Sequence, residues 1–358
     1  PPRSSLFPYT TLFRSSIEGG LQYLSEYADN IYDLKDSKVA GESNMDDLKL
    51  IDKDGKLAGI GYCFESFGII VNTELLEKAG HEIDDIKDFS TLKTIVEDIH
   101  SKAATNGFDA FTSSGLDLSS SWRFSGHLAN VPLFYESRDD GTWKETPENI
   151  NGTYLENYKN LWDLYVKNSA ASPEKLSSGE YDAEKEFGEK KAVFYQNGNW
   201  EYDALVNKYK LDPKTLTMIP LYAGVDGEDK AGLNSGTENY WIVNKKAPEE
   251  SIKATLDFMY WLVTDSEATK KLAVVFGYIP FKKAVEPENV FLTKAGKLED
   301  EGFYNMLWTF NLTPNVDDWR KALVDALTTY TTDNTDANWE LVKKAFVDGW
   351  EEQYKKQK

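Results

Sequence analysis

Residues 56–80 read KLAGIGYCFESFGIIVNTELLEKAG, and this stretch decides the fold class. Its turn-rich first half leads into residues 69–71, Ile-Ile-Val, a short apolar run of β-branched residues that is typical of a buried strand. Residues 73–79 then have the composition of a short helix, and Gly80 stands where a helix commonly ends. A buried strand followed at once by a helix predicts an α/β protein.

The same alternation continues along the chain. Leu92, Ile95 and Ile99 recur at helical spacing and predict a helix over 91–104, followed by a short strand over 108–112. Further strands are expected over 192–195, 216–220 and 239–244, and further helices over 154–167, around 252–263 and near the C-terminus. Helices that alternate with single strands favour doubly wound sheets, whose ligands bind beyond the carboxyl ends of the strands.

Two late helices have additional local signals. Residues 264–267 read TDSE, which predicts a capping box with Thr264 as the N-cap. The C-terminal helix has one strongly apolar face, which we expect to pack in the core: Trp339, Val342, Phe346 and Trp350.

Length and charge exclude some classes of protein. A chain of 358 residues exceeds the size at which one hydrophobic core usually stops growing, so two domains are predicted. The 60 acidic residues outnumber the 40 basic ones and give a formal net charge of -20, which disfavours nucleic acid and anionic membranes as partners. No apolar run approaches the roughly 18 residues that a membrane helix needs.

Cysteine and histidine are too few for the usual metal sites or disulfides. Cys63 is the single cysteine, so an internal disulfide is impossible, and we expect it to be a small buried residue. His81, His100 and His127 are not spaced as metal ligands, and no metal or cofactor is expected.

The sequence favours binding over catalysis. It has no G-x-S-x-G nucleophile elbow, no Walker A loop and no complete dinucleotide-binding glycine motif. It has 10 Trp, 20 Tyr and 18 Phe together with many carboxylates. Aromatic rings can cover the C–H face of a sugar while carboxylates accept its hydroxyl hydrogens. The abundant carboxylates leave a glycosidase pair open as an alternative.

Residues 1–16, PPRSSLFPYTTLFRSS, differ from the rest of the chain. Residues 6–15, LFPYTTLFRS, are the translation of a common sequencing-library adapter. We expect this segment to be adapter-derived, in which case the chain is truncated and the native start with its signal segment is missing.

Three motifs resemble the family-1 extracellular solute-binding proteins of ABC sugar importers, the maltose-binding-protein type. The first is residues 61–80, GYCFESFGIIVNTELLEKAG, which resembles a strand, an Asn and a helix ending in K-A-G. The second is residues 192–200, AVFYQNGNW, with the G-x-W turn. The third is residues 241–280, which contain NKKAP, TDSEATKKLA and GYIP in the family's order.

The resemblance implies a periplasmic-binding-protein-like α/β fold, with two doubly wound α/β lobes joined by a multi-crossover hinge. We expect lobe one to comprise residues 17–112 and about 265–311, without its N-terminal part. Lobe two would comprise residues 113–264 and about 312–358. The family binds its sugar between the lobes.

The resemblance also implies ligand-binding residues. Glu65 matches a sugar-contacting Glu of the hinge strand, and a carboxylate can accept two hydroxyl hydrogens. Trp200, in the G-x-W turn, matches a Trp that stacks on sugar. The other expected ligand-binding residues are Trp122, Trp319, Glu238, Asn239, Tyr62 and His127.

Together these features predict a non-enzymatic, monomeric solute-binding protein. It would capture a carbohydrate outside the cell and deliver it to the membrane permease subunits of an ABC importer. We expect it to be lipid-anchored at a Gram-positive cell surface, or else periplasmic. A carbohydrate-active enzyme such as a glycoside hydrolase is one alternative, and the same fold binding a peptide or polyamine is another.

Overall fold

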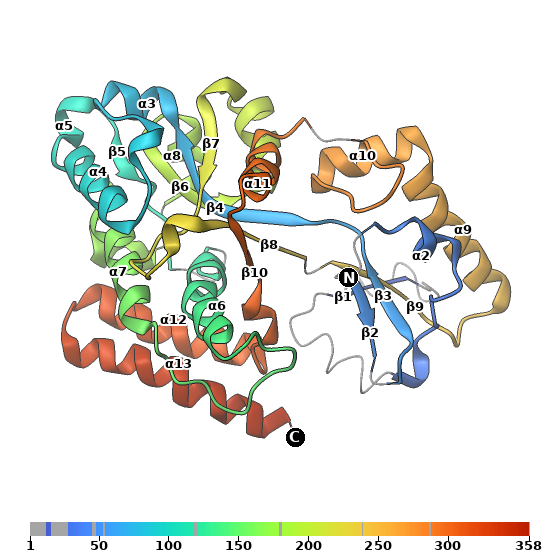
Figure 1. Ribbon diagram of the computed structural model, residues 1–358. Coiled ribbons are helices and arrows are strands. Elements are labelled where there is room, and N and C mark those ends of the chain that lie inside the picture. The colour runs from blue at the N-terminus through green and yellow to red at the C-terminus, as the bar shows by residue number, and fades with distance from the viewer. Residues whose placement is uncertain are drawn as a thin grey trace. The chain divides into compact units, whose positions relative to one another are not determined.

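The structure, a computed structural model, describes residues 12–15, 28–44, 48–52, 54–116, 120–178, 181–237, 239–285 and 288–357. Strands and helices alternate along it (Figure 1), which confirms the α/β class. The strands are β1 (Leu12–Ser15), β2 (Lys49–Ile51), β3 (Leu57–Gly61), β4 (Glu65–Asn72), β5 (Asp109–Phe111), β6 (Ala192–Gly198), β7 (Leu216–Ile219), β8 (Ala231–Gly236), β9 (Tyr240–Val243) and β10 (Tyr304–Leu307). The α-helices are α2 (Lys38–Glu42), α3 (Thr73–Lys78), α4 (Phe89–Ser101), α5 (Ala103–Asn106), α6 (Ala129–Asp139), α7 (Leu155–Lys167), α8 (Ala183–Gly188), α9 (Glu249–Thr264), α10 (Ser266–Phe276), α11 (Val290–Asp300), α12 (Val316–Thr332) and α13 (Asp336–Gln357).

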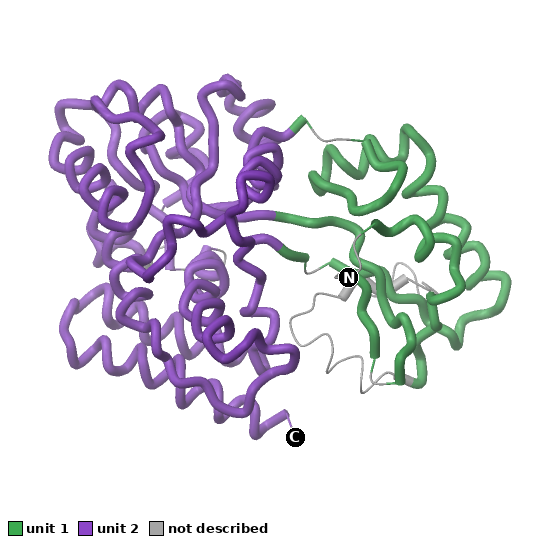
Figure 2. The backbone as a smooth tube through the Cα atoms, viewed as in Figure 1, with its two compact units in different colours: residues 1–65, 236–288 green, residues 66–235, 289–358 purple. Residues whose placement is uncertain are grey.

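The chain divides into two compact units, coloured separately in Figure 2. Unit 1 comprises residues 1–65 and 236–288, and unit 2 comprises residues 66–235 and 289–358. The chain therefore passes from one unit to the other three times.

These bounds differ from the expected lobes. The chain leaves unit 1 after Glu65 and not near residue 112, because β4 and β5 both pair with β6 in one sheet. Residues 289–311, expected in lobe one, belong to unit 2 because β10 pairs in parallel with β8. Residues 236–264, expected in lobe two, belong to unit 1, where β9 pairs with β3.

The sheet of unit 2 is centred on the motif that opened the sequence analysis. Its strand order is β10-β8-β4-β6-β5, and β7 also pairs with β4. Residues 66–72 of β4 are all buried, as predicted for the apolar run. Gly68 allows β7 to come close, because a Cβ there would lie 2.3 Å from the carbonyl oxygen of Ile219.

The predicted βα unit is confirmed. Asn72 caps α3, since its side-chain oxygen accepts a hydrogen bond from the backbone N–H of Leu75 at 3.1 Å. Gly80 follows the helix with a φ of +90°, a conformation that favours glycine. At α10 the predicted capping box is wrong by one residue. Thr264 still belongs to α9, and the N-cap is Asp265, whose carboxylate accepts from the N–H groups of Glu267 and Ala268.

The C-terminal helix packs as expected. The predicted apolar face of α13 is buried, and α13 lies against α12 in unit 2 (Figure 1). The indole N–H of Trp350 donates to the carbonyl oxygen of Pro147 at 2.9 Å, so the buried polar atom of this ring is satisfied.

Unit 1 contains an antiparallel sheet with the order β1-β9-β3-β2. Residues 12–15, within the segment expected to be adapter-derived, form β1 and pair with β9. Cys63 is fully buried, which confirms its predicted burial. In the described part of the chain, no helix is both long and apolar enough to span a membrane.

Candidate functional site

The turn after β6 positions Trp200. This turn is a short 3-10 segment, Asn199–Glu201. The indole N–H of Trp200 donates to the side-chain oxygen of Asn197 at 2.9 Å. Its ring lies directly over Gly198, where an added Cβ would be 2.2 Å from a ring carbon. The glycine of the G-x-W motif therefore makes room for the tryptophan ring two residues later.

Trp122 and His127 lie beside Trp200. Trp122 directly precedes the π-helical segment Arg123–Leu128, which carries His127. The His127 ring centroid is 4.8 Å from that of Trp122, in an edge arrangement, and 5.5 Å from that of Trp200. The two indoles are 6.1 Å apart, and His127 also stacks on Phe67 at 3.8 Å. We call Phe67, Trp122, His127 and Trp200 the aromatic cluster.

Only part of the aromatic cluster is open to a ligand. Phe67 and His127 are buried, whereas Trp122 and Trp200 are partly exposed. The buried pair therefore supports the two indoles from within unit 2. Partly exposed indoles with fixed positions suit stacking on an apolar ligand face.

His127 is held as a neutral ring. The side-chain N–H of Gln196 lies 2.9 Å from Nδ1 of His127 and 3.4 Å from the carbonyl oxygen of Gly68, so the amide donates and Nδ1 accepts. Burial keeps the pKa of His127 well below its ordinary value of 6.5, and the charges of Arg123 and Arg320 lower it further. A buried neutral His127 acts as support for the indoles, and its predicted ligand contact stays a prediction.

Polar contacts fix the Trp200 turn to the rest of unit 2. The backbone N–H of Ser66 donates to the side-chain oxygen of Asn199 at 2.6 Å, and the side chain of Asn289 donates to the carbonyl oxygen of Asn199 at 2.9 Å. Sequence reasoning missed Asn197, Gly198 and Asn199 as positioning residues. These residues stand in the sequence as N-G-N directly before Trp200, but only the tryptophan was identified as a site residue.

A carboxyl group with an unusual pKa lies next to Trp200 in the sequence. Burial, followed by the nearby charge of Glu184, raises the pKa of Glu201 to about 7. The charge of Arg123 and a hydrogen bond from Tyr195 act in the opposite direction. Glu201 therefore changes its charge near neutral pH, one residue beyond Trp200.

Three predicted residues meet in unit 1. The side-chain N–H of Asn239 donates to Glu65 at 3.3 Å, and the hydroxyl of Tyr62 donates to the side-chain oxygen of Asn239 at 3.2 Å. The Tyr62 ring is buried and stacks on Trp241 at 4.9 Å. Glu65 and Asn239 are partly exposed, so this polar group can offer both acceptors and donors to a ligand.

The structure corrects the expectation for Trp319. This residue lies in α12 and is 1% exposed. Its indole N–H donates to the carbonyl oxygen of Phe346 at 3.0 Å, and its ring packs edge-on against Phe346 and Trp350. No ring face is left for a sugar, because the α12–α13 contact covers it. Glu238, the remaining predicted residue, lies outside the described residues.

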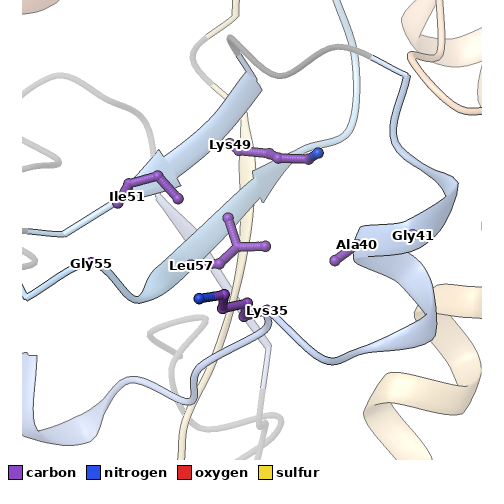
Figure 3. A pocket seen from close by; sticks show the side chains of 7 residues that line it. All are labelled: Lys35, Ala40, Gly41, Lys49, Ile51, Gly55 and Leu57. Atoms are coloured by element: carbon purple, nitrogen blue, oxygen red, sulfur yellow. The ribbon is translucent and has the colours of Figure 1, made fainter.

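A pocket of about 360 Å³ lies in unit 1, apart from all the predicted residues (Figure 3). Its lining offers two lysines and small or aliphatic side chains but no aromatic ring for stacking. The lining residues are Lys35, Ala40, Gly41, Lys49, Ile51, Gly55 and Leu57. Among the residues that the structure describes, no group of His, Cys, Asp and Glu is arranged to hold a metal ion.

The family is established by its sequence model. The model for bacterial extracellular solute-binding proteins matches residues 15–299, so the chain belongs to this family of receptors. This confirms the predicted class. No curated protein matches the chain.

Solved structures show the same fold at low sequence identity. A chitin oligosaccharide binding protein is 15% identical, with a TM-score of 0.68 over 97% of this chain and 84% of that chain. A family 1 extracellular solute-binding protein from Bifidobacterium longum subsp. infantis is 16% identical, with a TM-score of 0.63 over 95% and 84%. RafE in complex with raffinose is 13% identical, with a TM-score of 0.69 over 96% and 85%.

Proposed function

We propose that this protein binds a carbohydrate outside the cell and delivers it to the permease of an ABC importer. The observation that carries the proposal is the pair of partly exposed indoles, Trp122 and Trp200, fixed over the buried His127. Rings fixed before binding lose little conformational entropy when a ligand stacks on them. The names of two similar structures, which mention chitin oligosaccharide and raffinose, support a sugar as the ligand.

The polar group of unit 1 suits the same class of ligand. Glu65 can accept hydroxyl hydrogens, and Asn239 can both accept and donate. Sugar recognition needs such mixed polarity, because every hydroxyl is at once a donor and an acceptor.

Direct binding measurements test the proposal. We expect a panel of mono- and oligosaccharides, measured by calorimetry and tryptophan fluorescence, to contain at least one binder. Trp200→Ala and Trp122→Ala should each weaken that binding by about tenfold or more, because buried aromatic anchors dominate binding energies. The matched control is Trp261→Ala, since Trp261 is 48% exposed on α9 in unit 1 and should leave the affinity unchanged.

Other outcomes would contradict the proposal. Binding of a polyamine or peptide with no response to any sugar would favour the alternative ligands. Turnover of chromogenic glycosides would favour an enzyme. Delivery to the permease is tested by whether the sugar-loaded protein stimulates the ATPase activity of the cognate importer. Light scattering tests whether the protein is a monomer. Processing in the source cell that globomycin inhibits would support the lipid anchor.

A further inference from the structure

Arg123 is a buried cation whose charged group has no polar partner among the described residues. The residue is 8% exposed, and its Nε is completely buried without an acceptor. Its backbone N–H bonds to the carbonyl oxygen of Ser120, but its guanidinium makes no hydrogen bond or ion pair within the described part of the chain. The neighbours of the guanidinium are two aromatic rings, Trp122 at 5.6 Å and Tyr195 at 5.8 Å.

A buried guanidinium without an ion pair is unfavourable for folding unless a ligand supplies a hydrogen-bond acceptor. Burying an unpaired ion carries a large desolvation cost, and cation–π contacts with two rings offset only part of it. The charge of Arg123 lowers the pKa of Glu201, but no ion pair joins the two side chains. The guanidinium therefore keeps unused donors beside Trp122.

A second guanidinium lies close to the same segment. Nη2 of Arg320 would be 2.8 Å from a Cβ at Gly126, and its guanidinium lies 5.7 Å from the Phe310 ring. Both arginines lower the pKa of His127 through their charges. Two guanidinium groups therefore lie near the aromatic cluster in a chain with a net charge of -20.

We propose that the ligand of the aromatic cluster is an acidic carbohydrate, a sugar or oligosaccharide with a uronic acid residue whose carboxylate is bound by Arg123. The pyranose ring stacks on Trp122 or Trp200, and the carboxylate accepts hydrogen bonds from the guanidinium. Arginine matches carboxylate geometry with two parallel N–H donors, which makes it the stronger and more selective partner. This inference rests on the proposed function and specifies its ligand class.

The test compares matched neutral and acidic sugars. Calorimetry would use glucose with glucuronate, galactose with galacturonate, and their oligomers, at low and high salt. We expect the acidic member of at least one pair to bind about tenfold or more tightly at low salt, with a preference that weakens as salt screens the charge. Arg123→Gln should remove the preference, Arg123→Lys should keep part of it, and the control Arg138→Gln, in the same unit but over Tyr135, should not change it.

The outcomes separate this inference from the proposed function. Neutral sugars that bind as tightly as their acidic partners would overturn the inference and leave the proposed function intact. A panel in which no sugar binds would overturn both. Melting temperatures of all variants are measured in parallel. If Arg123→Gln lowers the melting temperature and leaves the preference for the acidic sugar unchanged, Arg123 has only a structural role and the inference is wrong.

Discussion

Gly198 and Trp200 show how single residues define the candidate site. The indole occupies the space that any side chain at position 198 would need, and Asn197 fixes its N–H. The family resemblance identified the tryptophan. It did not identify the cause of its position, because that cause is a contact between a backbone and a ring.

Gly198→Ala tests this contact. The backbone at 198 is extended, with a φ of -119°, so alanine is tolerated there and the added methyl acts on the ring alone. We expect the ring to move, the tryptophan fluorescence of the free protein to change, and sugar affinity to fall about as much as in Trp200→Ala. Gly41→Ala is the control, since nothing lies within 4 Å of a Cβ there. Unchanged affinity in Gly198→Ala would contradict the role of the ring position.

The buried neutral His127 predicts a pH dependence of stability. Its pKa is lowered in the folded state, so below about pH 6.5 the unfolded chain binds a proton that the folded protein does not. The free energy of unfolding should therefore fall by up to about 1.4 kcal/mol per pH unit as the pH drops below 6.5. Urea denaturation between pH 5 and 8 should show that the free energy of unfolding of His127→Gln falls less at acidic pH than that of the unchanged protein. Parallel curves for the two proteins would contradict this assignment.

At the scale of elements, local sequence patterns were sufficient to predict that a strand or helix exists and which of its faces is buried. The apolar run at residues 69–71 and the aromatic face of α13 follow from spacing alone, because burial of one face decides both. The first residue of α10 was missed because Thr264 and Asp265 are both acceptable N-caps in TDSE. Trp319 was misread because only the packing of α13 on α12 shows which face of α12 is covered.

The corrected cap gives a stability prediction. Asp265→Ala should lower the free energy of unfolding by about 1 kcal/mol, because two N–H groups at the start of α10 lose their acceptor. Thr264→Ala should cost only a few tenths of that, since its hydroxyl donates to the carbonyl oxygen of Tyr260 within α9. Chemical denaturation of both variants decides the matter, and a larger loss for Thr264→Ala would restore the sequence-based cap.

At the scale of the whole molecule, the sequence did not predict the features that depend on contacts between distant segments. The unit bounds depend on strand pairings between segments far apart in the chain, such as β10 with β8 and β4 with β6. No local pattern records which of several strands a given strand will join. The family resemblance predicted two α/β lobes and several crossings, but it placed the crossings at other residues.

Two units with separate cores predict thermal unfolding that deviates from a single two-state transition. Calorimetry should show two transitions. Val263→Ala, buried in the core of unit 1, should lower one of them, and Leu323→Ala, buried in the core of unit 2, should lower the other. A single transition that both substitutions shift equally would show that the units unfold together.

The threefold passage between units has a consequence for biosynthesis. Strand β8 leaves the ribosome before the segment 236–288 of unit 1, and its parallel partner β10 follows only after that segment. At roughly 5–20 residues per second, the nascent β8 waits several seconds for this partner. During translation the growing chain exposes an unpaired strand edge, so holding factors that bind emerging polypeptides should engage it in this interval.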